Sequence, residues 1–219
     1  MRRFIFWLLF PAMAILNHSC QSYSYIPPTI PVPMMDRAGE FQMSGGLQAP
    51  EEISVFMSYA VTDHLNLHLG YSTGHYMGIG YTLSSPLGRR VRGVMEIQGG
   101  ASRNGAYHYR AHPDSFNETR LLTEYMVQPS LGIRTNVVDL AVSLRFLKHR
   151  IQRVGNGSFF MEPFGTLKLG YKYIKLVVQY GSSTCLVCNG GAEFEERLYP
   201  TVFLLGLQVD IPTRKQTAH

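Results

Sequence analysis

The feature that most limits how this chain can fold is an alternation of apolar with small or polar residues, which recurs from about residue 39 onward. In the stretch NLHLGYSTGHYMGIGYTLSS, residues 66–85, Leu67 and Leu69 alternate with His68 and Gly70. Side chains of a β-strand point alternately to opposite faces, so this pattern predicts strands with one apolar and one polar face. No segment has the periodicity that predicts a helix with comparable strength.

The spacing of these segments predicts their arrangement. We expect ten strands, near residues 39–48, 53–61, 64–72, 75–84, 90–101, 120–134, 137–148, 159–170, 173–183 and 200–211. The connections after the second, fourth, sixth and eighth strands are short, whereas those after the fifth, seventh and ninth are long. Such an asymmetry is typical of outer-membrane barrels. The sequence therefore predicts an all-β fold: a closed antiparallel up-and-down transmembrane β-barrel of about ten strands, with eight as the alternative count.

The position of the charged residues indicates which face of the sheet is polar and which is apolar. Only 16% of the residues are charged, against about a quarter in an average soluble domain. The predicted strand charges alternate with the apolar residues and nearly balance, which favours a cross-linked, largely occluded lumen over an open pore. A soluble, lipocalin-like barrel with these charges outside is the alternative. The predicted lumen charge network comprises Glu40, Arg92, Glu96, Glu124, Arg134, Asp139, Arg145, Glu162, Lys168, Lys175 and Asp210.

The first residues are typical of an export signal. Two arginines precede the apolar run FIFWLLFPAMAIL, residues 4–16, which is too short to span a bilayer comfortably. Small Ser19 precedes Cys20, as at a lipoprotein cleavage site, although Asn17 occupies a position that is usually aliphatic. We therefore expect a signal peptide over 1–19, a lipid-anchored Pro-rich tether over 20–38, the barrel over 39–211 and a polar tail over 212–219. Ordinary signal-peptidase cleavage, with Cys20 unmodified, is the alternative.

Two further cysteines lie close together in TCLVCNGG, at Cys185 and Cys188. In an exported protein this spacing favours a disulfide that closes a loop. Free thiols, or a metal or redox function, are the alternatives, although no second pair of metal ligands accompanies the motif.

Candidate catalytic residues gather in the longest predicted loop, AYHYRAHPDSFNETR. A hydrolase could use His108, His112, Asp114, Ser115 and Glu118, and the two histidines could bind a metal, but loops are often rich in such residues without catalysis. Elsewhere, Pro129 and Pro163 interrupt predicted strands beside Gln128 and Glu162, where we expect β-bulges. The alternative interpretation makes Gln128 and Glu162 ligand-binding residues of the lumen.

Four segments resemble small outer-membrane β-barrel lipoproteins of Bacteroidetes-type bacteria. They are GEFQMSGGLQ, SYAVTDHLNLHLGYS, EYMVQPSLGIRTNVVDLAVSLRF and FMEPFGTLKLGYKYIKLVVQYG, and the resemblance spans roughly residues 20–211. Their motifs are strand and turn patterns, so the resemblance implies a fold and a location and supplies no site residues.

Three functional hypotheses follow. The first is an outer-membrane barrel of a Gram-negative bacterium with a structural or surface-binding role through its long loops. The second is a narrow pore for ions or small solutes, and the third is a hydrolase at the barrel rim. We expect outer-membrane lipid, the barrel assembly machinery and a surface ligand of unknown type as partners, with no cofactor and no metal. The net charge of +5 comes with no basic stripe for nucleic acid.

Overall fold

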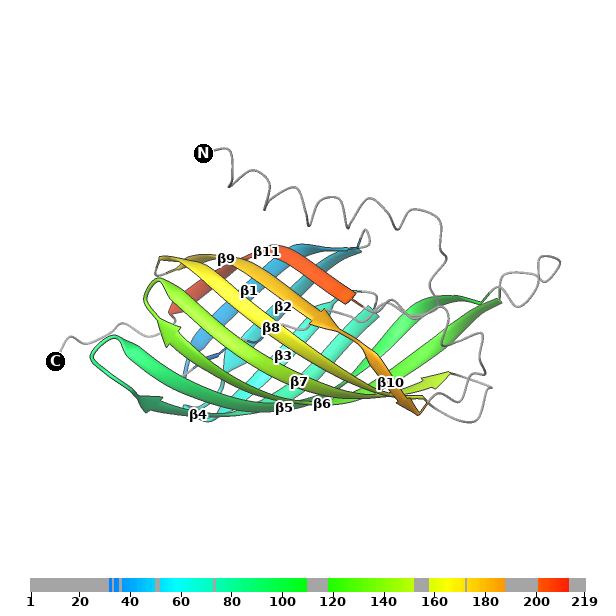
Figure 1. Cartoon of the computed structure of the whole chain (residues 1–219), viewed down its shortest axis with the longest axis horizontal. Coiled ribbons are helices and arrows are strands. Elements are labelled where there is room, and N and C mark those ends of the chain that lie inside the picture. The colour runs from blue at the N-terminus through cyan, green and yellow to red at the C-terminus, as the bar shows by residue number, and fades with distance from the viewer. Residues whose placement is uncertain are drawn as a thin grey trace.

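The computed structural model describes residues 32, 34, 35, 37–49, 52–72, 74–109, 118–151, 158–171, 173–187 and 201–212. These residues form one sheet of tilted strands (Figure 1). The strands are β1 (Glu40–Ala49), β2 (Glu52–Ala60), β3 (Leu65–Tyr71), β4 (Gly74–Pro86), β5 (Val91–Tyr109), β6 (Glu118–Thr135), β7 (Val138–Ile151), β8 (Phe159–Tyr171), β9 (Ile174–Ser182), β10 (Thr184–Val187) and β11 (Thr201–Pro212). Within these ranges, no helix is long and apolar enough to cross a membrane.

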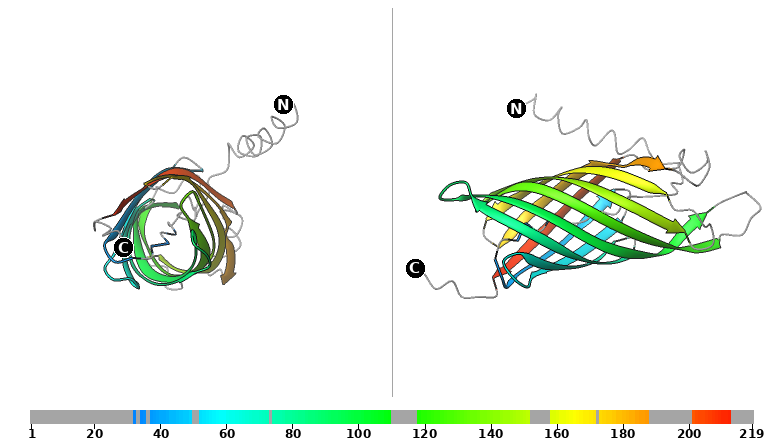
Figure 2. Two further views of the ribbon diagram at one scale, coloured as in Figure 1. Left: turned by 90° about the vertical axis from the view of Figure 1, so that its left-hand side faces the viewer. Right: turned by 90° about the horizontal axis from the view of Figure 1, so that it is seen from below.

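The sheet closes on itself through antiparallel pairs only. Strands β1 to β9 pair in chain order, β11 pairs with both β9 and β1, and the result is a ring when the molecule is viewed from one end (Figure 2). Strand β10 stands outside this ring of ten strands, because it pairs only with β8, beyond the point where β9 ends. The predicted closed, up-and-down barrel of ten strands is confirmed, with β10 as an addition.

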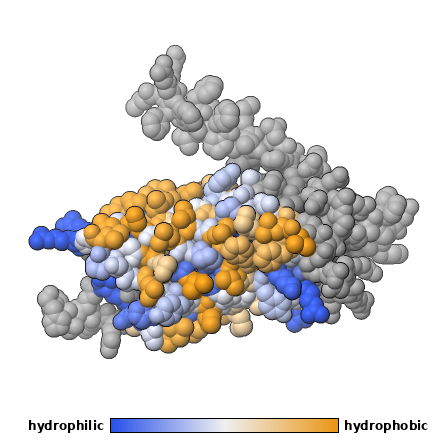
Figure 3. Space-filling view, turned by 60° about the horizontal axis from the view of Figure 1, so that its bottom comes forward, coloured by the Kyte–Doolittle hydropathy of each residue, from blue (hydrophilic) through white to orange (hydrophobic). Residues whose placement is uncertain are grey.

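The wall of the barrel separates side chains by polarity. In β4 the burial pattern alternates, so that Tyr76 and Thr82 are buried while Met77, Ile79 and Tyr81 are exposed. The same alternation runs round the barrel and leaves large apolar side chains exposed on the outside, as the hydropathy of the surface shows (Figure 3). Most of the buried side chains are polar or charged. The barrel therefore presents its apolar face outward and its polar face to the lumen.

Aromatic rings and glycines share the inner face. The ring of Phe56 lies over Gly70, the ring of Phe164 lies over Gly181, and Tyr76 lies against Gly100. A Cβ atom at any of these glycines would collide with the ring that covers it. Glycine is therefore required here by close approach, and the rings fill the space that the missing side chains leave.

The two ends of the barrel differ in their connections. At one end, here called the turn rim, lie the turns 61–64, 87–90, 136–137 and 172–173, together with the start of β1 and the end of β11. At the other end, the loop rim, lie the strand ends Ala49, Glu52, Tyr71, Gly74, Tyr109, Glu118, Ile151, Phe159, Ser182 and Thr201. The predicted strand ends are wrong near the longest loop. Strands β5 and β6 pair as far as Tyr109 and Glu118, with a register shift between Asn104 and Tyr107.

The β-bulges predicted at the two strand prolines do not occur. Pairing of β6 with β7 stops between Val127 and Ser130, but both sides of the gap keep the same register. Pro163 is paired with Leu144, again without a shift. Both prolines are exposed on the outer wall. Since proline has no backbone N–H group, each one removes a single hydrogen bond of the ladder without displacing the strands.

Candidate functional site

Three of the described residues before β1 lie inside the barrel. Val32, Met34 and Met35, here called the lumen segment, have only 1–2% of their surfaces exposed. Closer to β1, the backbone nitrogen of Gly39 donates to the carbonyl oxygen of Ala60, which fastens the chain at the turn rim. The chain thus runs from the turn rim to the middle of the lumen, where Figure 2 shows its blue trace within the ring. The sequence predicted this stretch as a tether, and that interpretation did not anticipate its position.

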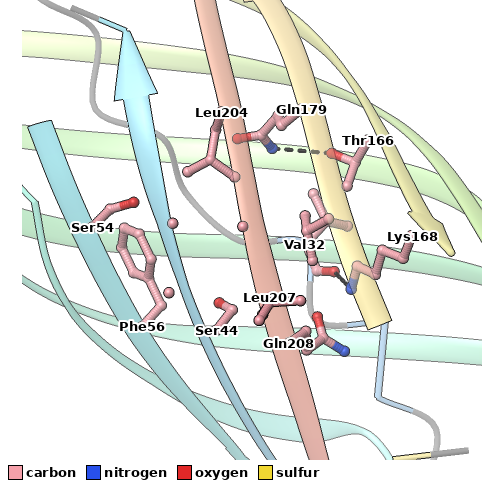
Figure 4. Close-up of a pocket in the computed structure, with 14 residues that line it drawn as sticks. Val32, Ser44, Ser54, Phe56, Thr166, Lys168, Gln179, Leu204, Leu207 and Gln208 are labelled. Carbon is pink, nitrogen blue, oxygen red and sulfur yellow. Dashed lines mark hydrogen bonds between the residues drawn. The ribbon is translucent and has the colours of Figure 1, made fainter. Parts of the chain in front are cut away.

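Two cationic side chains, one buried and one partly buried, bind the backbone of the lumen segment. The Lys168 Nζ atom donates a hydrogen bond to the carbonyl oxygen of Val32 (Figure 4). The Arg134 Nη1 atom donates to the carbonyl oxygen of Met34 at 3.0 Å and is also 3.0 Å from Glu40 Oε2. Hydrogen bonds from charged donors are stronger than neutral ones. These contacts satisfy carbonyl groups that have no strand partner.

Apolar contacts complete the fit of the segment. Val32 and Met34 form a buried cluster with Val94 and Ala141, which project inward from β5 and β7. The terminal methyl group of Met34 lies against Gly132, where a Cβ atom would come within 2.5 Å of it. The cavity beside Val32 measures only about 20 Å³, which is room for about one water molecule. The lumen is therefore filled at this level.

Ion pairs cross-link the lumen near the turn rim. Lys175 Nζ lies 2.5 Å from Asp139 Oδ2 and 3.8 Å from Asp210 Oδ2. The Gln208 amide donates to Asp210 at 2.6 Å. Because β7, β9 and β11 each contribute a charged group, the cluster ties together strands that are distant in the chain.

A second ion pair lies entirely out of contact with solvent. Arg145 and Glu162 have no exposed side-chain surface, and Arg145 Nε lies 2.5 Å from Glu162 Oε2. The guanidinium group is also 4.6 Å from the centre of the Phe164 ring, and Ser183 donates to Glu162 Oε1 at 2.8 Å. Burying two charges is tolerated when they are paired and hydrogen-bonded, and Glu162 accepts hydrogen bonds from both Arg145 and Ser183.

Two histidines join carboxylates in the lumen. His68 Nε2 lies 3.3 Å from Glu96 Oε1, while its Nδ1 lies 3.0 Å from the Ser58 hydroxyl. His149 Nε2 lies 3.4 Å from Glu124 Oε1, and Ser102 donates to Glu124. The first set has the composition of a hydrolytic triad. All three residues are only 2–3% exposed, however, so the arrangement gives a substrate no access.

The structure brings together much of the predicted charge network. Among its members, Glu96, Glu124, Asp139, Arg145, Glu162, Lys168, Lys175 and Asp210 are buried, and Glu40, Arg92 and Arg134 are partly buried. Sequence reasoning missed the pairing of His68 and His149 with these carboxylates, because a pairing depends on register. It also missed the lumen segment, for which the apolar residues Val32, Met34 and Met35 were the available signal.

Most of the other predicted site residues lie outside the part of the chain that the structure describes. Cys20, Cys188, His112, Asp114 and Ser115 lie outside the described residues, as do the side chains of His108 and Glu118. Cys185 lies in β10 and takes part in a disulfide, while its pairing with Cys188 stays a prediction. Across the described ranges, no three His, Cys, Asp or Glu side chains form a group that could hold a metal ion.

Comparison with known proteins adds no assignment. No protein-family model matches the chain, and no curated protein is significantly similar to it in sequence. The fold and the contacts of the lumen therefore carry the functional argument.

Proposed function

We propose that this chain is a small β-barrel of the outer membrane of a Gram-negative bacterium, with an occluded lumen and a structural or surface-binding role through its loop rim. The observation that carries the proposal is the inverted polarity of the wall. Leu131, Val142 and Ile79 are each about 60% exposed, whereas Arg145 and Lys168 have at most 1% exposed surface. Exposure of so much apolar surface to water would be costly, but it suits contact with hydrocarbon.

The architecture meets the main demand of a bilayer on a protein chain. Backbone groups within hydrocarbon need internal partners, and a closed barrel supplies them because it has no free edge. Several strands exceed the 9–11 residues needed to cross a bilayer, among them β4 with 13 and β7 with 14. The outer wall therefore has both the composition and the length of a membrane-spanning surface.

Exposed tyrosines add a second argument. Tyr59, Tyr171 and Tyr173 lie on the outside near the turn rim, and Tyr71 and Tyr125 lie on the outside toward the loop rim. Tyrosine favours the boundary between hydrocarbon and headgroups. Two such groups, separated by an apolar band, fit the two interfaces of one bilayer.

The lumen segment supports an occluded barrel rather than a pore. Its backbone is held by Lys168 and Arg134, and its side chains pack against the wall. We infer that the barrel does not conduct, and that binding takes place at the loop rim. A signal peptide over 1–19, a lipid on Cys20 and kinship with the Bacteroidetes-type lipoproteins belong to the same proposal.

Cell fractionation and conductance test this function. We expect the chain in the outer-membrane fraction, with a gel mobility that changes on heating, as folded barrels show. The purified protein in planar bilayers should give no steady unitary currents. Recovery of a soluble protein in the absence of detergent would overturn the membrane location. Steady currents from a correctly folded barrel would instead establish the pore hypothesis.

A further inference from the structure

The outer wall contains a hollow toward the loop rim. Its volume is about 590 Å³, and it extends across the wall from β2 to β6. Its floor is apolar and consists of Val55, Met57, Leu69, Met77 and Ala101. At the side nearest the loop rim it is bordered by Tyr71, His75 and Arg103. An apolar floor with a polar border is suited to a molecule that has an apolar and a polar part.

Cationic side chains continue from this border along the wall. His75 faces Arg103 across β4 and β5, Arg103 faces Thr123 on β6, and Thr123 faces Arg150 on β7. Lys148 lies two residues before Arg150 on the same outer face. All four basic side chains are exposed. We call His75, Arg103, Lys148 and Arg150 the cation row.

The described part of the wall offers this row no acidic partner. Every described Asp or Glu side chain of a strand is buried or partly buried on the inner face, and exposed Asp63 lies in a turn at the opposite rim. Between described residues, no ion pair involves the cation row. Arg103, Lys148 and Arg150 carry positive charges on one face of the sheet, and like charges close together on a sheet are destabilising. Among the described residues nothing compensates the charge of this row, which makes it a candidate site for an external anion.

The spacing of the row suggests how many anionic groups are needed. His75 and Arg103 occupy adjacent strands, while Lys148 and Arg150 share β7, on the other side of β6. Since neighbouring strands are about 4.8 Å apart, the two basic pairs are separated by about 10 Å. Arginine binds phosphate oxygens through two parallel hydrogen bonds, and lysine binds them as a point charge. Two phosphate groups about 10 Å apart would match this arrangement.

We propose that the hollow and the cation row bind one lipid that carries two phosphate groups, in the leaflet at the loop rim. Its acyl chains lie over Met57, Leu69 and Met77. One phosphate contacts Arg103 and His75, and the other contacts Arg150 and Lys148. This inference rests on the proposed membrane location and adds a specific lipid to it.

The test uses the full chain in phosphatidylcholine nanodiscs that contain a small fraction of one probe lipid. The probes are diphosphoryl lipid A, monophosphoryl lipid A and phosphatidylglycerol, and bound lipid is counted by native mass spectrometry. Diphosphoryl lipid A should be retained most. The double variant R103Q/R150Q should weaken its retention by about tenfold or more, since each cation provides a charge-assisted hydrogen bond. The control R89Q/R90Q makes the same charge change at the turn rim and should leave retention unchanged.

The outcomes separate the two proposals. Equal retention of phosphatidylglycerol and diphosphoryl lipid A, or equal effects of the two double variants, would overturn the lipid site while leaving the membrane barrel intact. A chain that does not insert into nanodiscs, and stays folded without detergent, would overturn the membrane location itself. Heat-dependent gel mobility of each variant shows that it has folded.

Discussion

The charged side chains on the inner and outer faces of the same strands differ in their partners. On the inner face Arg145 is buried against Glu162, and Lys175 is buried against Asp139. On the outer face Arg103 and Arg150 are exposed with no acid beside them among the described strand residues. The inner charges stabilise the barrel by meeting each other, whereas the outer charges are left for an external anion. One alternating pattern thus encodes both a cross-linked interior and an outer surface whose charges are exposed to a ligand.

Removal of one charged side chain from the inner face should give the largest loss of stability. Glu162→Ala leaves the fully buried Arg145 without its carboxylate, and we expect the free energy of unfolding to fall by about 3–5 kcal/mol. Urea unfolding of the barrel in detergent micelles measures it. Arg145→Leu with Glu162→Leu should recover most of the loss, because no charge is then left buried. The outer-face control Arg103→Ala should change the stability by no more than about 0.5 kcal/mol. Equal losses for Glu162→Ala and Arg103→Ala would contradict the contrast between the faces.

A charge added to the apolar band should have the next largest effect. Leu131 is 60% exposed on the outer wall, and Leu131→Arg should destabilise the barrel by about 2–4 kcal/mol if this position lies at the bilayer midplane. Unfolding in lipid vesicles measures the cost. Leu87→Arg places the same group in an exposed turn and should cost no more than about 0.5 kcal/mol. A harmless Leu131→Arg variant would indicate that water, not hydrocarbon, covers the wall.

Loss of the hydrogen bond from Lys168 to the lumen segment should have the third largest effect. Lys168→Met removes the donor to the Val32 carbonyl oxygen, and we expect a loss of about 1.5–3 kcal/mol, as for a hydrogen bond to a charged group. Hydrogen exchange of peptides that cover residues 32–39 should become faster. Lys148→Met, on the outer face, should leave that exchange unchanged. Unchanged exchange in Lys168→Met would show that apolar packing alone retains the segment.

The glycines beneath aromatic rings give the smallest expected effect. A Cβ atom at Gly100 would lie 2.6 Å from the Tyr76 ring and from the carbonyl oxygen of Met77, so Gly100→Ala should cost about 1–3 kcal/mol through overpacking. The midpoint of the heat-dependent mobility change measures it. Gly88→Ala meets no atom within 4 Å and serves as the control. Similar midpoints for the two variants would show that the ring and strand shift without strain.

More of the fold than of the candidate site could be predicted from the sequence. Alternation around Leu67, His68 and Leu69 predicted strands and their faces, because side-chain direction in a strand depends only on neighbouring residues. It did not predict that β5 and β6 extend to Tyr109 and Glu118, since a polar extension lacks the apolar face that marks a strand. Nor could it pair His68 with Glu96, which face each other only through the register of three strands.

The amino-acid sequence specified the period-two pattern, the individual strands and the separation of charged from apolar faces, but it left the strand count at eight or ten. These properties are local, so each stretch of chain carries them independently. The tertiary structure alone decided which charges meet, where β10 joins β8, and that Val32 and Met34 enter the lumen. Those outcomes depend on closing the ring, because only closure creates an enclosed space whose free carbonyl groups and cations must satisfy one another.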